Sequence, residues 1–131
     1  MKFYKCEKCG KILEQIQTSK CEMVECCHQP MTIMTANTSD GAKEKHVPVV
    51  EQNGNLVTVT VGSIEHPMME EHYIQWIVLE TEGGNQKKYL KPGEKPQAVF
   101  AVTEGERVLA AYEYCNLHGL WMKNYEQLDF E

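Results

Sequence analysis

The positions of the cysteines constrain the fold of this 131-residue chain more than any other feature, because five of the six fall within its first 27 residues. Cys6 and Cys9 form a C-x2-C motif followed by Gly10, a turn in which two thiolates can converge on one ion. Cys26 and Cys27 are adjacent, and adjacent side chains on a strand point to opposite faces. This second pair can therefore bind the same ion only if the backbone turns sharply there. A segment shorter than about 40 residues usually needs disulfides, a metal or oligomerisation to fold.

Four cysteine sulfurs select zinc or iron, and their spacing does not decide between the two metals. A disulfide framework and unrelated free thiols are the alternatives. The N-terminal sequence MKFYKCEKCG has no apolar segment typical of a secretory signal, so we expect a cytoplasmic protein, in which structural disulfides are rare. The longest apolar run, VLAAY, is far shorter than the roughly 20 residues of a membrane helix. Cys21 belongs to neither pair and is predicted to be a free thiol.

The net charge of −6, from 13 basic and 19 acidic residues, argues against a nucleic-acid or anionic-membrane partner. A local positive site could still attract a small anion. The polar, turn-prone segment 36–41, with the sequence ANTSDG, separates the cysteine-rich head from the rest. We therefore predict a head of residues 1–36 and a body of residues 37–131.

The body is predicted to be all β. Segment 56–62, LVTVTVG, alternates valine with threonine, as a strand with one solvated face does. Further strands are predicted at 73–81, 98–103 and 107–115, and shorter ones at 46–51, 87–91 and 121–130. Seven short strands in about 95 residues favour a β-sandwich, and no segment of the body has a sustained helical period.

Four of the five histidines lie in the body, and each lies in a loop or at a strand end. His66 and His72 are six residues apart, so neither a regular helix nor a regular strand lets both bind one ion, and the segment must loop back if they do. Cys115 and His118 form a Cys-x2-His turn that can present both donors to one metal. His46 is predicted to open a strand. Each histidine alone is more often a surface residue than a ligand, but the set indicates one shared mononuclear site.

Four neutral imidazoles and one thiolate are too many donors for structural zinc, which is closed at four. Thiolate and imidazole together suit iron, zinc or copper, and an iron with one open position would bind a small ligand such as oxygen, superoxide or peroxide. A thiolate opposite that position would push electron density onto the bound ligand. Lys45, beside His46, could draw in a small anion, although a solvated lysine is the simpler interpretation.

These motifs resemble those of the desulfoferrodoxin family, the two-iron class of superoxide reductases. FYKCEKCG and ECCHQPM are similar to a desulforedoxin-like module, and EKHVPV, EHPMMEEHYIQWI and YCNLHGLW are similar to a neelaredoxin-type domain. The resemblance implies a small metal-bound β module followed by a seven-stranded immunoglobulin-like sandwich, usually in a homodimer.

Carried over motif by motif, the resemblance implies a ligand set for each of two irons. The ligands of the first would be Cys6, Cys9, Cys26 and Cys27. The ligands of the second would be the equatorial His46, His66, His72 and His118 and the axial Cys115. Glu44 would close the open position in the oxidised state, and Lys45 would guide superoxide and help to orient the proton donor.

The activity implied is one-electron reduction of superoxide to hydrogen peroxide, with electrons resupplied by a rubredoxin-like donor. The head iron would be an electron relay or only a structural clip, and zinc could replace it. Two other functions stay open on the sequence: a rubredoxin-like electron-transfer protein, and a structural zinc-module binding protein without redox chemistry.

Overall fold

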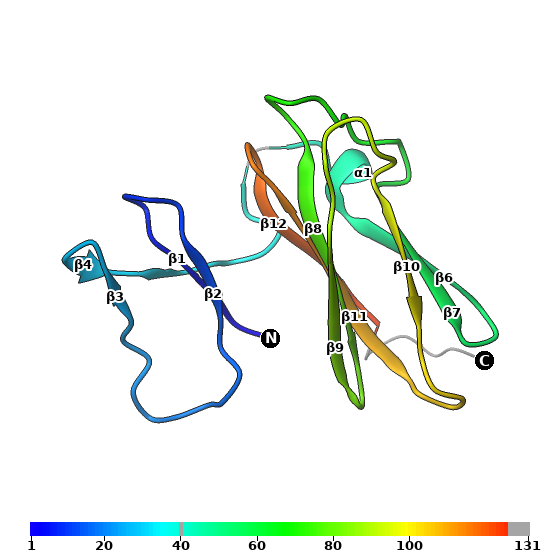
Figure 1. Cartoon of the computed structure of the whole chain (residues 1–131), viewed down its shortest axis with the longest axis horizontal. Coiled ribbons are helices and arrows are strands. Elements are labelled where there is room, and N and C mark those ends of the chain that lie inside the picture. Colours follow the sequence, from blue (N-terminus) through cyan, green and yellow to red (C-terminus); the bar gives the residue numbers. More distant parts are fainter. Residues whose placement is uncertain (40, 126–131) are drawn as a thin grey trace. The chain divides into compact units, whose positions relative to one another are not determined.

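The computed structural model describes residues 1–39 and 41–125, and it divides the chain into two compact units, Met1–Thr35 and Ala36–Glu131 (Figure 1). Within the described part, the chain contains no helix that is both long and apolar enough to cross a membrane.

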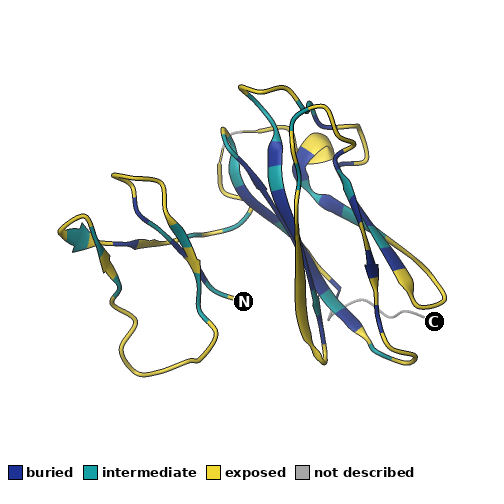
Figure 2. Cartoon of the chain, in the orientation of Figure 1, coloured by how far each residue is buried: buried dark blue, intermediate teal, exposed yellow. Residues whose placement is uncertain are grey.

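Unit 1 consists of very short strands. Its three-stranded sheet has the order β2 (Ile12–Glu14), β1 (Phe3–Lys5), β5 (Thr32–Ile33), and a separate hairpin joins β3 (Glu25–Cys26) to β4 (Gln29–Pro30). The buried cluster of this unit consists of Tyr4, Cys6 and Met31, and most of the chain around it is exposed (Figure 2). So small a core supports the expectation that cysteine chemistry holds this unit together.

Unit 2 is a sandwich of two antiparallel sheets. One sheet has the order β10 (Gln97–Ala101), β7 (Leu56–Val61), β6 (Pro48–Asn53). The other has the order β12 (Gly119–Asn124), β11 (Val108–Cys115), β8 (Ile74–Thr81), β9 (Gly84–Tyr89). Within the described residues, these seven strands confirm the predicted all-β, immunoglobulin-like class.

Alternation of side chains builds the core between the two sheets. Val57, Val59 and Val61 of β7 are fully buried, while the threonines between them are only partly buried. They pack with residues that include Ile77 of β8 and Phe100 of β10. Cys115, the last residue of β11, belongs to this same cluster, so the core fixes the position of one predicted metal ligand.

The predicted strand at 46–51 is wrong at its start. His46 is the last residue of a one-turn helix, α1 (Lys43–His46), and β6 begins two residues later at Pro48. One turn is too short to show a helical period, which is why the sequence pattern missed it. The predicted strand at 121–130 corresponds to β12, which ends at Asn124, and residues 126–131 lie outside the described part of the chain.

Candidate metal centres

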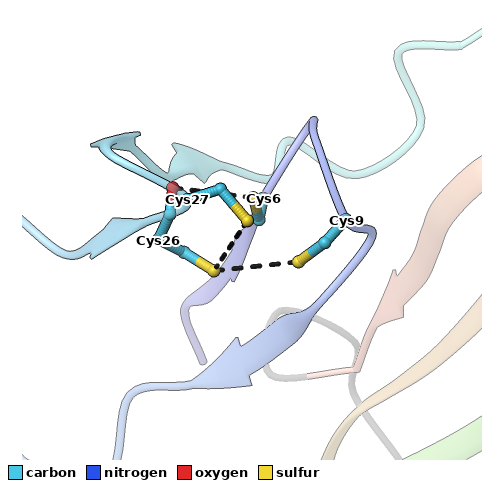
Figure 3. A group of neighbouring side chains, drawn as sticks. All are labelled: Cys6, Cys9, Cys26 and Cys27. Carbon is cyan, nitrogen blue, oxygen red and sulfur yellow. Dashed lines mark hydrogen bonds between the residues drawn. The ribbon is translucent and has the colours of Figure 1, made fainter.

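Four of the five cysteines of the head meet at one point. The sulfurs of Cys6, Cys9, Cys26 and Cys27 all lie within 4.8 Å of one another (Figure 3). The Cys26 sulfur lies 3.7 Å from that of Cys9 and 3.8 Å from that of Cys27. Cys21, as predicted, is a free and exposed thiol outside this group.

A tight turn allows two adjacent cysteines to face the same point. Cys27 and His28 have φ of 54° and 62° and form the two-residue loop between β3 and β4. Positive φ at both central residues is the mark of a type I′ hairpin turn. The backbone thus turns sharply at the second cysteine pair, as the sequence required for a shared ion.

The four thiols are unequal before any metal binds. Backbone N–H groups, first that of Cys9 and then that of Lys8, lower the pKa of the Cys6 thiol to about 7. Hydrogen bonding to Cys9, and further contact with the other sulfurs, raises the pKa of Cys27 to about 12. One thiol of this group therefore ionises readily, whereas another keeps its proton. A metal cation bound among the four sulfurs would stabilise their thiolate forms.

The four histidines of the body form a closed ring of imidazoles. Centroids of neighbouring rings lie 4.6 Å apart for His46 and His66, 4.7 Å for His66 and His72, 5.0 Å for His72 and His118, and 4.8 Å for His118 and His46. Each pair meets edge to face. The Cys115 sulfur lies 3.8 Å from Nδ1 of His118. Donor atoms of His46, His66, Cys115 and His118 all lie within 4.8 Å of one another; His72 falls outside this limit, although its ring completes the cycle.

Three separate segments supply the ring. The β11–β12 hairpin carries Cys115 and His118, and α1 ends with His46. His66 and His72 lie on the loop between β7 and β8, which folds back on itself through paired backbone hydrogen bonds between Met69 and His72. This fold-back solves the spacing problem that the six-residue separation posed.

The nitrogens of the ring suit a metal ion. Nδ1 of His66 lies 2.7 Å from the Pro67 carbonyl oxygen, so Nδ1–H donates there and Nε2 is left to act as a ligand. Nε2 of His66 and of His72 are buried and make no hydrogen bond to a described residue. Burying such an atom unpaired costs about 1–3 kcal/mol, which a metal ion would offset. Burial first, and then neighbouring charges, lower the pKa of His46 to about 4, so this ring is neutral and able to bind metal at neutral pH.

The comparisons with known proteins agree with this pair of sites. The family model "Desulfoferrodoxin" matches residues 38–124. The chain belongs to the desulfoferrodoxin family. Desulfoferrodoxin from Nitratidesulfovibrio vulgaris is 52% identical over 118 residues, covering 90% of this chain and 91% of the relative.

Solved structures of superoxide reductases are similar to this desulfoferrodoxin-family chain. The superoxide reductase from Treponema pallidum matches with a TM-score of 0.78 and 39% identity, covering 93% of this chain and 98% of the other. A one-iron superoxide reductase from Giardia intestinalis matches with a TM-score of 0.52 and 38% identity, covering 62% of this chain and 96% of the other.

Two residues that the sequence analysis missed lie beside His46 in this member of the desulfoferrodoxin family. Glu113 is completely buried, and its Oε2 lies 3.4 Å from Nδ1 of His46. Burial raises the pKa of Glu113 well above its usual range. Trp121, opposite Glu113 on β12, stacks on the His46 ring at 4.9 Å, and its Nε1–H donates to the His118 carbonyl oxygen. A charged residue inside a strand that is otherwise buried is the sequence signal that could have identified Glu113.

Glu44 and Lys45 are exposed on α1, immediately before His46. Burial is the main cause that lowers the pKa of His46, His66 and His72, and the positive charge of Lys45 adds a smaller contribution at each of these three rings. The Glu44 carbonyl oxygen accepts hydrogen bonds from the Ile64 N–H and the Ser63 hydroxyl, which hold α1 against the loop that carries His66.

We expect Gly62→Ala to disturb the placement of α1. Gly62 has φ of +81°, and a Cβ there would lie 2.5 Å from the Glu44 carbonyl oxygen and 2.6 Å from the Lys45 carbonyl carbon. Both are backbone atoms, so α1 must shift, and a left-handed alanine itself costs of order 1–3 kcal/mol. The variant should unfold at lower denaturant concentration and bind less metal in the body site. Gly54→Ala, at φ +63° with open space around the new Cβ, is the control for backbone strain alone. Equal metal loss in both variants would contradict the packing argument.

Proposed function

We propose that this protein is a superoxide reductase, which transfers one electron to superoxide and releases hydrogen peroxide. The observation that carries this proposal is the closed ring of four imidazoles beside the buried Cys115 thiol. A site of five donors exceeds the four of structural zinc and fits an iron with an open position. The Treponema pallidum and Giardia intestinalis structures are named as superoxide reductases, which supports the same activity here.

Reduced iron held by the four histidines and Cys115 would supply the electron that, with two protons, converts superoxide to hydrogen peroxide. The protein groups prepare this step in separate ways. Neutral imidazoles leave the cation charge undiminished, whereas the single thiolate reduces it and donates electron density. The buried Cys115 end of the site lies in the apolar core, so substrate must approach from the exposed loops rather than through the sandwich.

Lys45 and Glu44 are proposed as the residues that handle substrate and the open position. The charge of Lys45 acts on three of the rings, so an anion entering the ring would feel it as well. Glu44 is its exposed neighbour on α1 and would provide the carboxylate that closes the open position after oxidation. The net charge of −6 makes such a local positive charge more important for attracting an anion.

Residues 1–36 are proposed as a desulforedoxin-like module with iron held by four cysteines, and residues 37–131 as the catalytic domain. The convergent sulfurs support the first assignment, although zinc could replace iron in a structural site. We further propose that a rubredoxin-like protein donates the electrons. We also propose that the chain forms a homodimer, which light scattering tests directly. All six cysteines are free thiols, which suits a reducing cytoplasm.

Metal content and peroxide yield test the proposed function together. Protein purified without oxygen or added metal should contain two irons per chain by elemental mass spectrometry, or one iron and one zinc if the head is only a clip. The reduced protein should yield one hydrogen peroxide for each superoxide consumed. A dismutase would give half that yield, because it oxidises one superoxide for each one it reduces. Zinc alone, or no superoxide consumption, contradicts the proposal.

We expect Lys45→Ala to slow superoxide consumption about tenfold, because the anion loses its electrostatic guide. Pulse radiolysis of the reduced protein at low ionic strength measures the second-order rate constant, and the salt dependence of that constant should shrink in the variant. Lys95→Ala, an exposed lysine at the β9–β10 turn, is the matched control. Unchanged turnover in Lys45→Ala would favour the alternative of a simple electron-transfer protein.

A further inference from the structure

A pocket that carries two lysines lies beside β12 and is bordered by α1 and the residue that links α1 to β6. It has a volume of about 410 Å³ and is lined by residues that include Lys43 of α1, Lys123 of β12 and the apolar Val47 and Trp121. Lys43 and Lys123 are both exposed, and none of the described residues that line the pocket is acidic. This concave site combines three apolar residues with two lysines and two asparagines, on a chain with a net charge of −6.

The pocket has a firm wall. Asn37 lies along the outer edge of β12, where its side-chain amide donates to the Met122 carbonyl oxygen and its Oδ1 accepts from the Met122 N–H. Its backbone N–H donates to the Leu120 carbonyl oxygen. These three hydrogen bonds occupy the otherwise open edge of β12, so a partner at this edge meets the pocket and its lysines rather than a free strand edge.

Trp121 connects this pocket to the metal-binding ring. The tryptophan lines the pocket, and its indole stacks on the His46 imidazole with centroids 4.9 Å apart and planes 14° apart. Its Nε1–H is fixed on the His118 carbonyl oxygen, so one side chain contacts two of the proposed ligand residues. A path from the pocket to the ring therefore runs through two stacked aromatic rings.

We propose that this pocket is the docking site of an acidic one-electron donor protein, and that Trp121 and His46 form the route by which the electron enters. The inference rests on the proposed function, which requires the metal centre to be reduced again after each superoxide. Docking would pass one electron from the reduced donor, which becomes oxidised, to a ferric ion held by the four histidines and Cys115, which would become ferrous, and no bond would be made or broken.

Charge complementarity selects an acidic partner for this edge. The acidic excess of the chain repels such a protein from most of the surface, whereas Lys43 and Lys123 attract it to one place. A partner carboxylate can pair with each lysine while an apolar side chain enters the space against Val47 and Trp121. Binding and electron transfer can then be tested separately, because Lys43 and Lys123 bind the donor whereas the indole of Trp121 carries the electron.

The binding test uses the iron-loaded protein and zinc-substituted rubredoxin, an acidic probe without redox-active iron. We expect Lys43→Glu/Lys123→Glu to raise the dissociation constant at least about tenfold by isothermal titration calorimetry. Lys87→Glu/Lys95→Glu is the matched control, since it makes the same change in net charge near the opposite, β9–β10 edge. It should change the constant less than about twofold. The proposal is overturned if Lys43→Glu/Lys123→Glu binds rubredoxin as tightly as the wild type does, or if the control variant loses as much affinity.

The kinetic test separates the indole from the lysines. With reduced rubredoxin and oxidised protein in a stopped-flow instrument, Trp121→Phe should lower the limiting rate of reduction while changing the dissociation constant less than about twofold, because phenylalanine keeps an aromatic wall for the apolar contact. The lysine variant should show the reverse pattern. An unchanged limiting rate in Trp121→Phe refutes the electron route. Superoxide consumption by pre-reduced protein needs no donor, so it should be normal in the lysine variant. If the pre-reduced wild type consumed no superoxide, the proposed function would be wrong, and the binding result would still stand.

Discussion

Replacing His118 with alanine should abolish superoxide consumption while leaving the head site loaded. His118 closes the imidazole ring, with centroids 5.0 Å from His72 and 4.8 Å from His46, and its Nδ1 lies 3.8 Å from the Cys115 sulfur. Its loss removes one donor and opens the ring at the turn that also positions Cys115. We expect the rate of superoxide consumption to fall at least about 100-fold, a larger loss than removal of a group that only supports a ligand.

The measurement combines elemental analysis with pulse radiolysis of the reduced protein. His118→Ala should lose the body metal and keep the head metal. The control is His28→Asn, which alters an exposed histidine next to the head cysteines and retains a residue that tolerates its φ of +62°. Full superoxide consumption in His118→Ala would mean that the ring is not the reactive site.

The extent to which the sequence predicts this molecule depends on how local the signal is. The valine–threonine alternation of β7 and the Cys-x2-His turn after β11 are short-range patterns, and the structure has both as expected. The pairing of Cys26 with Cys27 required a sharp turn, and the positive φ of Cys27 and His28 provides it. In each case the local chemistry left few conformations open.

Long-range features were not accessible in the same way. The one-turn helix that ends at His46 has no period to detect, and the backbone contacts of Gly62 that hold it depend on the meeting of two distant segments. Trp121 looks like an ordinary core residue in the sequence, yet it stacks on an imidazole 75 positions earlier in the chain. The groups that surround the ligands depend on how the strands pair, and a short stretch of sequence does not contain that information.

Glu113 is the clearest example of such a group, and Glu113→Gln should raise the reduction potential of the body centre and weaken its hold on metal. Glu113 Oε2 lies 3.4 Å from Nδ1 of His46, and neither of its oxygens makes a hydrogen bond to a described residue. Burial raises the pKa of Glu113 and so disfavours its charged form. A metal cation bound on the other side of the His46 imidazole would lower that pKa and favour the charged carboxylate. The negative charge of a carboxylate 3.4 Å from Nδ1 of His46 makes the imidazole a stronger donor to a metal ion and so stabilises the oxidised metal.

A neutral amide of the same shape keeps the packing and removes the charge. We expect metal affinity to fall about 10- to 100-fold, the range seen when the partner of a ligating histidine is lost. Competition with a chelator and a redox titration followed by visible absorbance measure the two effects separately. Glu80→Gln is the matched control, because Glu80 lies on the neighbouring strand β8 and accepts a hydrogen bond from the Tyr112 hydroxyl instead of facing a ligand. If both variants keep the wild-type potential and affinity, Glu113 only fills space; if Glu113→Gln alone changes both, the carboxylate sets the donor strength of His46.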